Sequence, residues 1–214
     1  MFDSYITREA CNIYIIAKDK DAILIDPGYN KNNALINHIK KLGVTIKAIL
    51  ITHSHYDHID ALEDVIKEYP DIVTYISNED VETLVEPRYN LSMFREFGSE
   101  KPLTFLPKNL VLVSDNDEFN LLGYNVKVIA TPFHTKGSVC YLFKDEKILF
   151  SGDTLFFSSI GRTDLPGGED RKIGSSLSKL MKLDDDIVVY PGHGIKSNLG
   201  REKKYNSYLK DLPN

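Results

Sequence analysis

Three of the six histidines in this 214-residue chain fall within one hexapeptide, which reads His53-Ser54-His55-Tyr56-Asp57-His58. Imidazole nitrogens and carboxylate oxygens are metal ligands, and together they suit zinc, iron or manganese. Two histidines that are separated by one residue in an extended loop can reach the same ion. The Asp-His pair that follows is displaced along the turn, so it can reach a second ion nearby. The hexapeptide therefore predicts ligands for two neighbouring divalent ions.

Three further side chains of the same kinds follow apolar runs later in the chain, at His134, Asp153 and His193. Each lies where the run stops at a proline or a glycine, in Thr131-Pro132-Phe133-His134, Ser151-Gly152-Asp153 and Pro191-Gly192-His193. Strand ends converge at one edge of a sheet, and ligands and catalytic groups gather there. Asp153 lies in sequence between the two histidines, and its two oxygens allow it to bridge both ions.

The segments that would position these side chains are predicted from their apolar patterns. Strands are expected at residues 11–17, 22–25, 46–52, 72–76, 110–113, 118–122, 125–129, 138–143, 147–150 and 187–190. Helices are expected at 33–42, 59–69, 172–183 and 199–209, with Gly43 as a C-cap, and the less regular residues 78–107 are expected to form a short helix followed by a long surface excursion. The pattern favours an α/β chain. It fits two sheets packed face to face with helices outside (an αββα sandwich), or a single α/β sheet.

The overall composition indicates one globular domain, taken as residues 1–214, because 42% of the residues are hydrophobic and 27% are charged. The net charge of −5 argues against a nucleic-acid partner. No run of about 18 apolar residues occurs, and residues 1–8 lack the features of a signal peptide. We therefore expect a cytoplasmic protein without a membrane partner. Cys11 and Cys140 lie in apolar runs and are expected to be reduced core residues.

The pattern His53-x-His55-x-Asp57-His58 with the later His134, Asp153 and His193 resembles the signature of the metallo-β-lactamase superfamily. In particular, the chain is similar to the short bacterial glyoxalase II-like (hydroxyacylglutathione hydrolase-like) proteins. The segments that carry this similarity are Gly152–Phe156, Gly161–Gly168, Pro191–Gly194, Leu199–Lys203 and Asn206. The resemblance implies the four-layer αββα fold of that superfamily.

The resemblance also implies two metal sites, with zinc as the expected metal and iron or manganese as alternatives. Its ligand sets are His53, His55 and His134 for the first ion, and Asp57, His58 and His193 for the second, with Asp153 bridging. Phe133 stands where the family usually has glycine, and it is expected to narrow the pocket or to shift the His134 loop.

The function that follows from the resemblance is hydrolysis of a small-molecule thioester by a metal-activated hydroxide. Asp57 is expected to orient the hydroxide and to take its proton. Lys196, Arg201 and Lys203 follow His193 and are candidates to bind a substrate carboxylate, with a solvated helix face as the alternative.

Two other features are expected to support the metal ligands. Asp26 ends a strand and is expected to orient a ligand loop, with an ordinary turn aspartate as the alternative. Arg162 and Asp164 are expected to form a buried pair that braces the loop of Asp153.

Three competing functions stay possible on the sequence alone. The first is a persulfide dioxygenase of the same superfamily, with a single iron on His53 or His55, His134 and Asp153. The second is hydrolysis of a lactone or a phosphodiester, and the third is a non-catalytic metal-binding module. One bound iron per chain and oxygen uptake on a thiol persulfide would identify the first of them.

Overall fold

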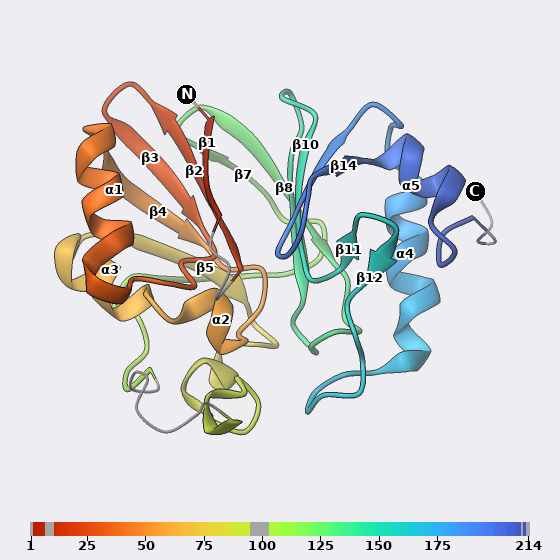
Figure 1. Cartoon of the computed structure of the whole chain (residues 1–214), viewed down its shortest axis with the longest axis horizontal. Coiled ribbons are helices and arrows are strands. Elements are labelled where there is room, and N and C mark those ends of the chain that lie inside the picture. The colour runs from red at the N-terminus through yellow and green to blue at the C-terminus, as the bar shows by residue number, and fades with distance from the viewer. Residues whose placement is uncertain (1, 7–10, 95–102, 211, 213–214) are drawn as a thin grey trace. The chain divides into compact units, whose positions relative to one another are not determined.

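The computed structural model describes residues 2–6, 11–94, 103–210 and 212, and it consists of two compact units. Unit 1 comprises Met1–Ile76 and Asp80–Leu112, and unit 2 comprises Ser77–Glu79 and Val113–Asn214. Each unit is built around a six-stranded sheet and carries its own helices (Figure 1). Part of the irregular segment expected at 78–107, residues 95–102, lies outside the described residues.

The sheet of unit 1 has the strand order β1-β2-β3-β4-β5-β6. Ser77 and Val113, the last residues of β5 and β6, are the only described residues of this sheet that are grouped with unit 2. Its strands are β1 (Phe2–Ile6), β2 (Asn12–Lys18), β3 (Asp21–Ile25), β4 (Thr45–Leu50), β5 (Val73–Ser77) and β6 (Leu110–Val113). Strands β3, β4 and β5 are parallel, and Leu50 pairs with Ile25 on one side and with Tyr75 on the other. The chain therefore leaves β3 and β4 at the same edge of the sheet, and Asp26 and His53 follow these two strands.

The helices of unit 1 cover its sheet through apolar side chains at helical spacing. The helices are α1 (Ala34–Leu42), the short α2 (Tyr56–Ile59) and α3 (Leu62–Glu68), with 3-10 turns at η1 (Lys31–Asn33), η2 (Glu82–Val85) and η3 (Ser92–Phe94). Leu35 and Ile39 of α1 and Leu62 of α3 belong to one buried cluster with the sheet. Gly43 ends α1 with a φ of 70°, which confirms the predicted C-cap.

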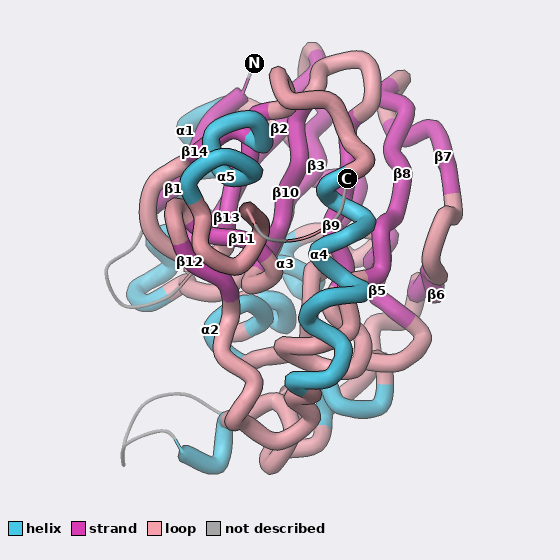
Figure 2. The backbone as a smooth tube through the Cα atoms, turned by 90° about the vertical axis from the view of Figure 1, so that its right-hand side faces the viewer, coloured by secondary structure: helices cyan, strands magenta, loops and turns pink. Residues whose placement is uncertain are grey.

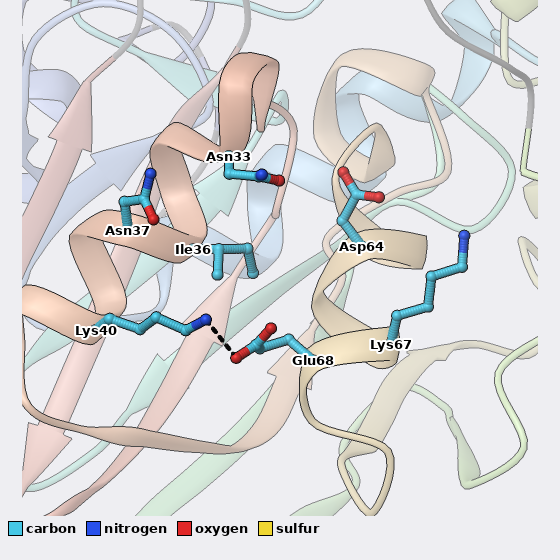
Figure 3. A pocket seen from close by; sticks show the side chains of 7 residues that line it. All are labelled: Asn33, Ile36, Asn37, Lys40, Asp64, Lys67 and Glu68. Carbon is cyan, nitrogen blue, oxygen red and sulfur yellow. Dashed lines mark ion pairs between the residues drawn. The ribbon is translucent and has the colours of Figure 1, made fainter.

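A groove of about 270 Å³ lies on the surface of unit 1 between α1 and α3 (Figure 3). Its lining residues are Asn33, Ile36, Asn37, Lys40, Asp64, Lys67 and Glu68. An ion pair of 2.6 Å between Lys40 Nζ and Glu68 Oε1 joins the two helices across it. None of the predicted metal ligands lines this groove, so it is separate from the chemistry that the sequence predicts.

The sheet of unit 2 has the strand order β14-β13-β10-β9-β8-β7. Its strands are β7 (Glu118–Leu121), β8 (Tyr124–Ala130), β9 (Val139–Phe143), β10 (Ile148–Gly152), β13 (Val188–Pro191) and β14 (Ser197–Asn198), and β11 (Leu155–Phe156) pairs with β12 (Ser159–Ile160) in a small hairpin. Strand β9 is antiparallel to both β8 and β10, and β10 is parallel to β13. Strands β8, β10 and β13 therefore run in one direction, and their C-terminal ends lie at one edge of the sheet.

The helices of unit 2 form a second core with this sheet. They are α4 (Ile173–Met181), which the 3-10 turn η4 (Asp170–Lys172) precedes, and α5 (Leu199–Tyr205). Leu177 and Leu180 of α4 and Leu199 of α5 share one buried cluster with Leu149 and Val189 of the strands. Figure 2 views this unit with α4 and α5 in front of the sheet. Among the described residues, no helix is long and apolar enough to cross a bilayer.

Each strand predicted from the sequence is present, and its bounds differ by no more than two residues from those observed. The strands of the two units form separate six-stranded sheets, so the single-sheet alternative is wrong. The predicted helix 59–69 is interrupted, because α2 ends at Ile59 and α3 begins at Leu62. The predicted helix 199–209 ends early, because Asn206 adopts an extended backbone after Tyr205. The single domain over residues 1–214 stays a prediction.

Candidate metal centre

The histidine-rich segment of unit 1 lies in the loop that follows β4 and in the first turn of α2. His55 has an extended backbone, with φ −60° and ψ 142°, immediately before α2. His53 Nε2 lies 3.1 Å from His55 Nδ1, and the ring centres of His53 and His58 are 4.1 Å apart. Two nitrogens bound to one tetrahedral zinc at about 2.0–2.1 Å lie roughly 3.3 Å from each other. The spacing of His53 and His55 therefore fits two ligands of the same ion.

Asp26 orients the imidazoles of this loop, as the sequence predicted. Its Oδ2 accepts hydrogen bonds from Thr52 Oγ1 at 2.7 Å and from His58 Nδ1 at 2.9 Å. Because Nδ1 of His58 carries the proton, Nε2 presents its lone pair, and it lies 3.9 Å from Asp57 Oδ2. Thr52 Oγ1 uses its proton on Asp26, so it accepts from His53 Nδ1 at 3.1 Å. His53 therefore also presents Nε2 as a ligand atom.

Asp26→Asn is expected to weaken metal binding by about 10- to 100-fold, because an amide can replace only one of the two accepting oxygens. The amide nitrogen would oppose either the Thr52 N–H, now 2.8 Å from Oδ1, or the donors on Oδ2. The measurement is the zinc dissociation constant in competition with a chromogenic chelator. Asp21→Asn is the matched control, because the Asp21 side chain is half-exposed, at 46%, and pairs with Lys47 at 3.7 Å. Equal zinc affinity of the Asp26 variant and the control would contradict the role of Asp26.

Unit 2 brings His134, Asp153 and His193 together at the edge where β8, β10 and β13 end. His134 Nδ1 donates to the carbonyl oxygen of Arg162 at 2.7 Å, so its Nε2 presents the lone pair. Asp153 Oδ2 lies 3.4 Å from His134 Nε2 and 3.6 Å from His193 Nε2. One carboxylate oxygen thus lies within reach of two ligand nitrogens, one after the end of β8 and one after the end of β13. That arrangement suits a carboxylate that bridges two ions.

A glycine allows another backbone segment to lie close to Asp153. Gly161 follows the β11–β12 hairpin, and a Cβ atom at this position would lie 1.9 Å from the Asp153 carbonyl oxygen and 3.2 Å from His134 Cγ. In unit 1, a Cβ at Gly28 would lie 1.7 Å from the Asp57 carbonyl oxygen. Glycine at both positions allows the backbone to approach the ligand segments closely.

The seven predicted ligands therefore fall into two clusters, which we call half-sites. The half-site of unit 1 comprises His53, His55, Asp57 and His58, and that of unit 2 comprises His134, Asp153 and His193. Groups of histidine and aspartate that could hold a metal ion are thus present among the described residues. The donor set contains imidazoles and carboxylates only, which suits zinc, iron or manganese.

The cysteines do not add a thiolate to this donor set. Cys11 and Cys140 are both buried and free, which confirms the prediction that they are reduced core residues. Burial raises the pKa of the Cys11 thiol to about 12 and that of Cys140 to about 11. Both side chains are therefore neutral thiols at physiological pH.

Phe133 does not narrow a pocket, contrary to expectation. Its side chain is fully buried and packs in the core of unit 2 with Leu155 and Leu177. Its carbonyl oxygen accepts a hydrogen bond from the Glu169 N–H at 2.8 Å. The ring turns into the core because burial of an aromatic side chain is strongly favourable. The other expected effect of Phe133, a shift of the His134 loop, stays a prediction.

Arg162 and Asp164 form a pair, but the pair is not buried. Arg162 Nε and Nη2 each donate to Asp164 at 2.6 Å, and the two side chains are 63% and 66% exposed. The hydrogen bonds from Arg162 lower the pKa of Asp164 to about 2. Solvent screens such a pair, so it contributes little to stability. Arg162 contacts the half-site through its backbone carbonyl instead, a role that its residue type does not signal.

The three candidate substrate-binding cations have different surroundings. Lys203 Nζ donates to the Leu183 carbonyl at 2.5 Å and to Asp185 Oδ1 at 2.7 Å, so it holds α5 to the loop that follows α4. Arg201 lies with Cζ 3.6 Å from the ring centre of Phe157. Lys196 is exposed. A substrate role for Lys196, Arg201 and Lys203 stays a prediction.

Comparison with known proteins identifies the family. Residues 6–193 match the family described as "Metallo-beta-lactamase superfamily", and this range includes all seven predicted ligands. Hydroxyacylglutathione hydrolase GloC of Haemophilus influenzae is 34% identical over 192 residues, which are 89% of this chain and 88% of that protein.

Two solved structures extend the similarity to the fold. The crystal structure of the BLEG-1 B3 metallo-beta-lactamase matches with a TM-score of 0.88 at 33% identity, over 98% of this chain and 99% of that chain. TTHA1623 in a di-iron-bound form matches with a TM-score of 0.81 at 28% identity, over 95% and 98% of the two chains. The chain therefore belongs to the metallo-beta-lactamase superfamily and has its mixed α/β fold.

Proposed function

We propose that this protein is a thioester hydrolase whose two half-sites together hold two divalent metal ions. The ligands would be His53, His55 and His134 for one ion, Asp57, His58 and His193 for the other, and Asp153 for both. The observation that carries the proposal is the position of Asp153 Oδ2, within 3.4 Å of His134 Nε2 and 3.6 Å of His193 Nε2. His134 and His193 belong to the two different ligand sets, so a carboxylate within reach of both nitrogens can serve both ions. Zinc is the expected metal, and the di-iron form of TTHA1623 makes iron the first alternative.

The residues of the chain would then direct a water toward the thioester. Bound metal ions supply a water of lowered pKa and polarise a carbonyl group. Asp57 has a carboxylate that is 23% exposed, so it can accept a hydrogen bond from this water and take its proton. The water oxygen forms the new bond to the thioester carbon, the C–S bond breaks, and the sulfur leaves with its electron pair. Asp26 accepts a hydrogen bond from His58 Nδ1, and the Arg162 carbonyl accepts one from His134 Nδ1. Both imidazoles therefore keep the tautomer in which Nε2 presents its lone pair to a metal ion.

A thioester is the preferred substrate class for two reasons. The sulfur of a thioester leaves as a thiolate, and thiols are acidic enough, with a pKa of about 8.5, to leave without a general acid. The proposed centre accordingly needs no further acid beyond the seven ligands. The relative GloC is named as a hydroxyacylglutathione hydrolase, which supports a small-molecule thioester as the substrate.

Metal analysis together with three assays tests the proposal. The purified protein is expected to contain about two metal ions per chain and to hydrolyse an S-hydroxyacylglutathione, with activity lost on chelation and restored by zinc. A chromogenic β-lactam is included because BLEG-1 is a metallo-beta-lactamase. Turnover of the β-lactam without turnover of the thioester would overturn the substrate class. One iron per chain, with oxygen uptake on a thiol persulfide, would instead identify a dioxygenase.

A further inference from the structure

Unit 2 contains a fully buried carboxylate that is not one of the half-site residues. Glu202 of α5 has no exposed surface, and four groups donate hydrogen bonds to it. The Ser158 N–H and Asn206 Nδ2 donate to Oε2 at 2.8 and 3.0 Å. Arg201 Nη1 and Ser197 Oγ donate to Oε1, the former at 2.5 Å. Burying a charge is costly unless it is paired and hydrogen-bonded, and these four donors meet that requirement.

The donors come from three separate segments of the chain. Ser158 forms the turn of the β11–β12 hairpin, where it has a φ of 59°. Ser197 begins β14, and Asn206 follows the end of α5. Asn206 Nδ2 also donates to the Ser159 carbonyl at 3.1 Å, so the hairpin is held at two points. Glu202 thus joins the hairpin, β14 and α5 through one side chain.

Each of the first two segments leads directly to a ligand of the half-site. The β11–β12 hairpin begins two residues after Asp153 and ends immediately before Gly161. Arg162, the next residue, accepts the hydrogen bond that orients His134. Ser197 lies four residues after His193. A change in the position of the hairpin or of β14 would therefore displace Asp153, the carbonyl behind His134, or His193.

We propose that Glu202 is a positioning residue, which fixes the hairpin and the β14 segment so that Asp153, His134 and His193 keep their ligand geometry. The inference rests on the proposed function, because it assumes that this half-site binds metal. Residues that orient metal ligands typically affect metal affinity or activity by about 10- to 100-fold when replaced. We expect an effect in this range from Glu202 although it donates no atom to the ion.

Glu202 is present as the carboxylate at neutral pH. Burial raises the pKa of Glu202, but the hydrogen bonds from Ser197, Ser158 and Asn206 and from Arg201 outweigh burial, and the pKa is lowered. Glutamine at this position would keep the shape but would offer one acceptor and one donor group to four donors. At least two of the four hydrogen bonds would then be lost.

Glu202→Gln tests the inference through metal binding rather than turnover. The variant is expected to bind zinc about 10- to 100-fold more weakly in chelator competition. Its cobalt-substituted form is expected to show a shifted visible absorption spectrum, because the ligand field changes when the ligands move. A role confined to folding would lower the thermal unfolding midpoint and leave the spectrum of the folded protein unchanged. Glu118→Gln is the matched control, because Glu118 is an exposed residue of unit 2 that pairs with Lys144 at 2.9 Å.

Ser197→Ala provides a second variant, which removes one donor to the carboxylate and decides the question if Glu202→Gln does not fold. It is expected to weaken zinc binding toward the lower end of the same range and to shift the cobalt spectrum in the same direction. Wild-type zinc affinity and a wild-type cobalt spectrum in the folded variants would overturn the inference and leave the proposed function intact. Absence of metal binding by the wild-type protein would overturn the proposed function itself.

Discussion

Replacing Asp153 by asparagine is expected to lower thioester turnover by about 10³-fold and to reduce the tightly bound metal from two ions toward one. Asp153 Oδ2 is shared between His134 Nε2 at 3.4 Å and His193 Nε2 at 3.6 Å, so its negative charge would serve both ions. An amide oxygen carries no net charge and is a poorer ligand for two cations. Loss of one metal ion would remove positive charge next to the reacting oxygens. The rate of turnover should then fall at least as much as it does when one oxyanion-hole donor is removed, which is roughly 10²–10³-fold.

The measurement for Asp153→Asn is the rate of thioester hydrolysis together with metal content after dialysis against a weak chelator. Asp186→Asn is the matched control, because Asp186 is an exposed aspartate of the same unit that pairs with Lys147 at 2.5 Å. The control should keep wild-type rate and metal content, since exposed pairs contribute little. A variant that still bound two ions and hydrolysed the thioester at more than a tenth of the wild-type rate would show that Asp153 does not bridge.

The grouping of the predicted ligands within each unit was predictable from the sequence because polar side chains interrupt the apolar runs there. His53, Asp153 and His193 each follow a buried strand within a few residues, and strand ends of the same direction lie at one sheet edge. The role of Asp26 was predictable for the same reason, since it follows β3 immediately. Long apolar strands were found reliably because β-branched residues at the core dominate their patterns.

Features that depend on backbone atoms or on distant packing were not predictable. The carbonyl of Arg162 orients His134, and any residue type supplies a carbonyl. The sequence indicates no role for Glu202 beyond its place in Leu199–Lys203, one of the segments that carry the family resemblance. The buried carboxylate depends on hydrogen-bond donors that lie up to 44 residues away in sequence. The two-residue strands of the β11–β12 hairpin are too short to show an alternating pattern. Phe133 was expected to narrow a pocket because it stands where the family usually has glycine, whereas hydrophobic burial turns its ring into the core.

Gly161→Ala is expected to destabilise the protein by about 1–3 kcal/mol and to lower turnover by about 10²-fold. The added methyl group would lie 1.9 Å from the Asp153 carbonyl oxygen, well inside contact distance, and 3.2 Å from His134 Cγ. The backbone of the β11–β12 hairpin or of Asp153 must therefore move. A displacement of about 1 Å at a reacting centre is enough to cost roughly 10²-fold in rate.

Gly174→Ala is the control that separates this steric effect from the general consequence of replacing a glycine by alanine. Gly174 lies inside α4, and a Cβ there meets no atom within 4 Å. Gly174 is the second residue of α4, and alanine is favoured over glycine in helices, by up to roughly 0.5–1 kcal/mol in a helix interior, so this variant should be at least as stable as the wild type with unchanged turnover. Thermal unfolding of both variants measures the change in stability, and thioester hydrolysis measures the change in turnover. A Gly161→Ala protein with wild-type stability and rate would show that the hairpin can move away from Asp153 without disturbing the half-site. The close approach of the two segments would then have no role in holding the ligands.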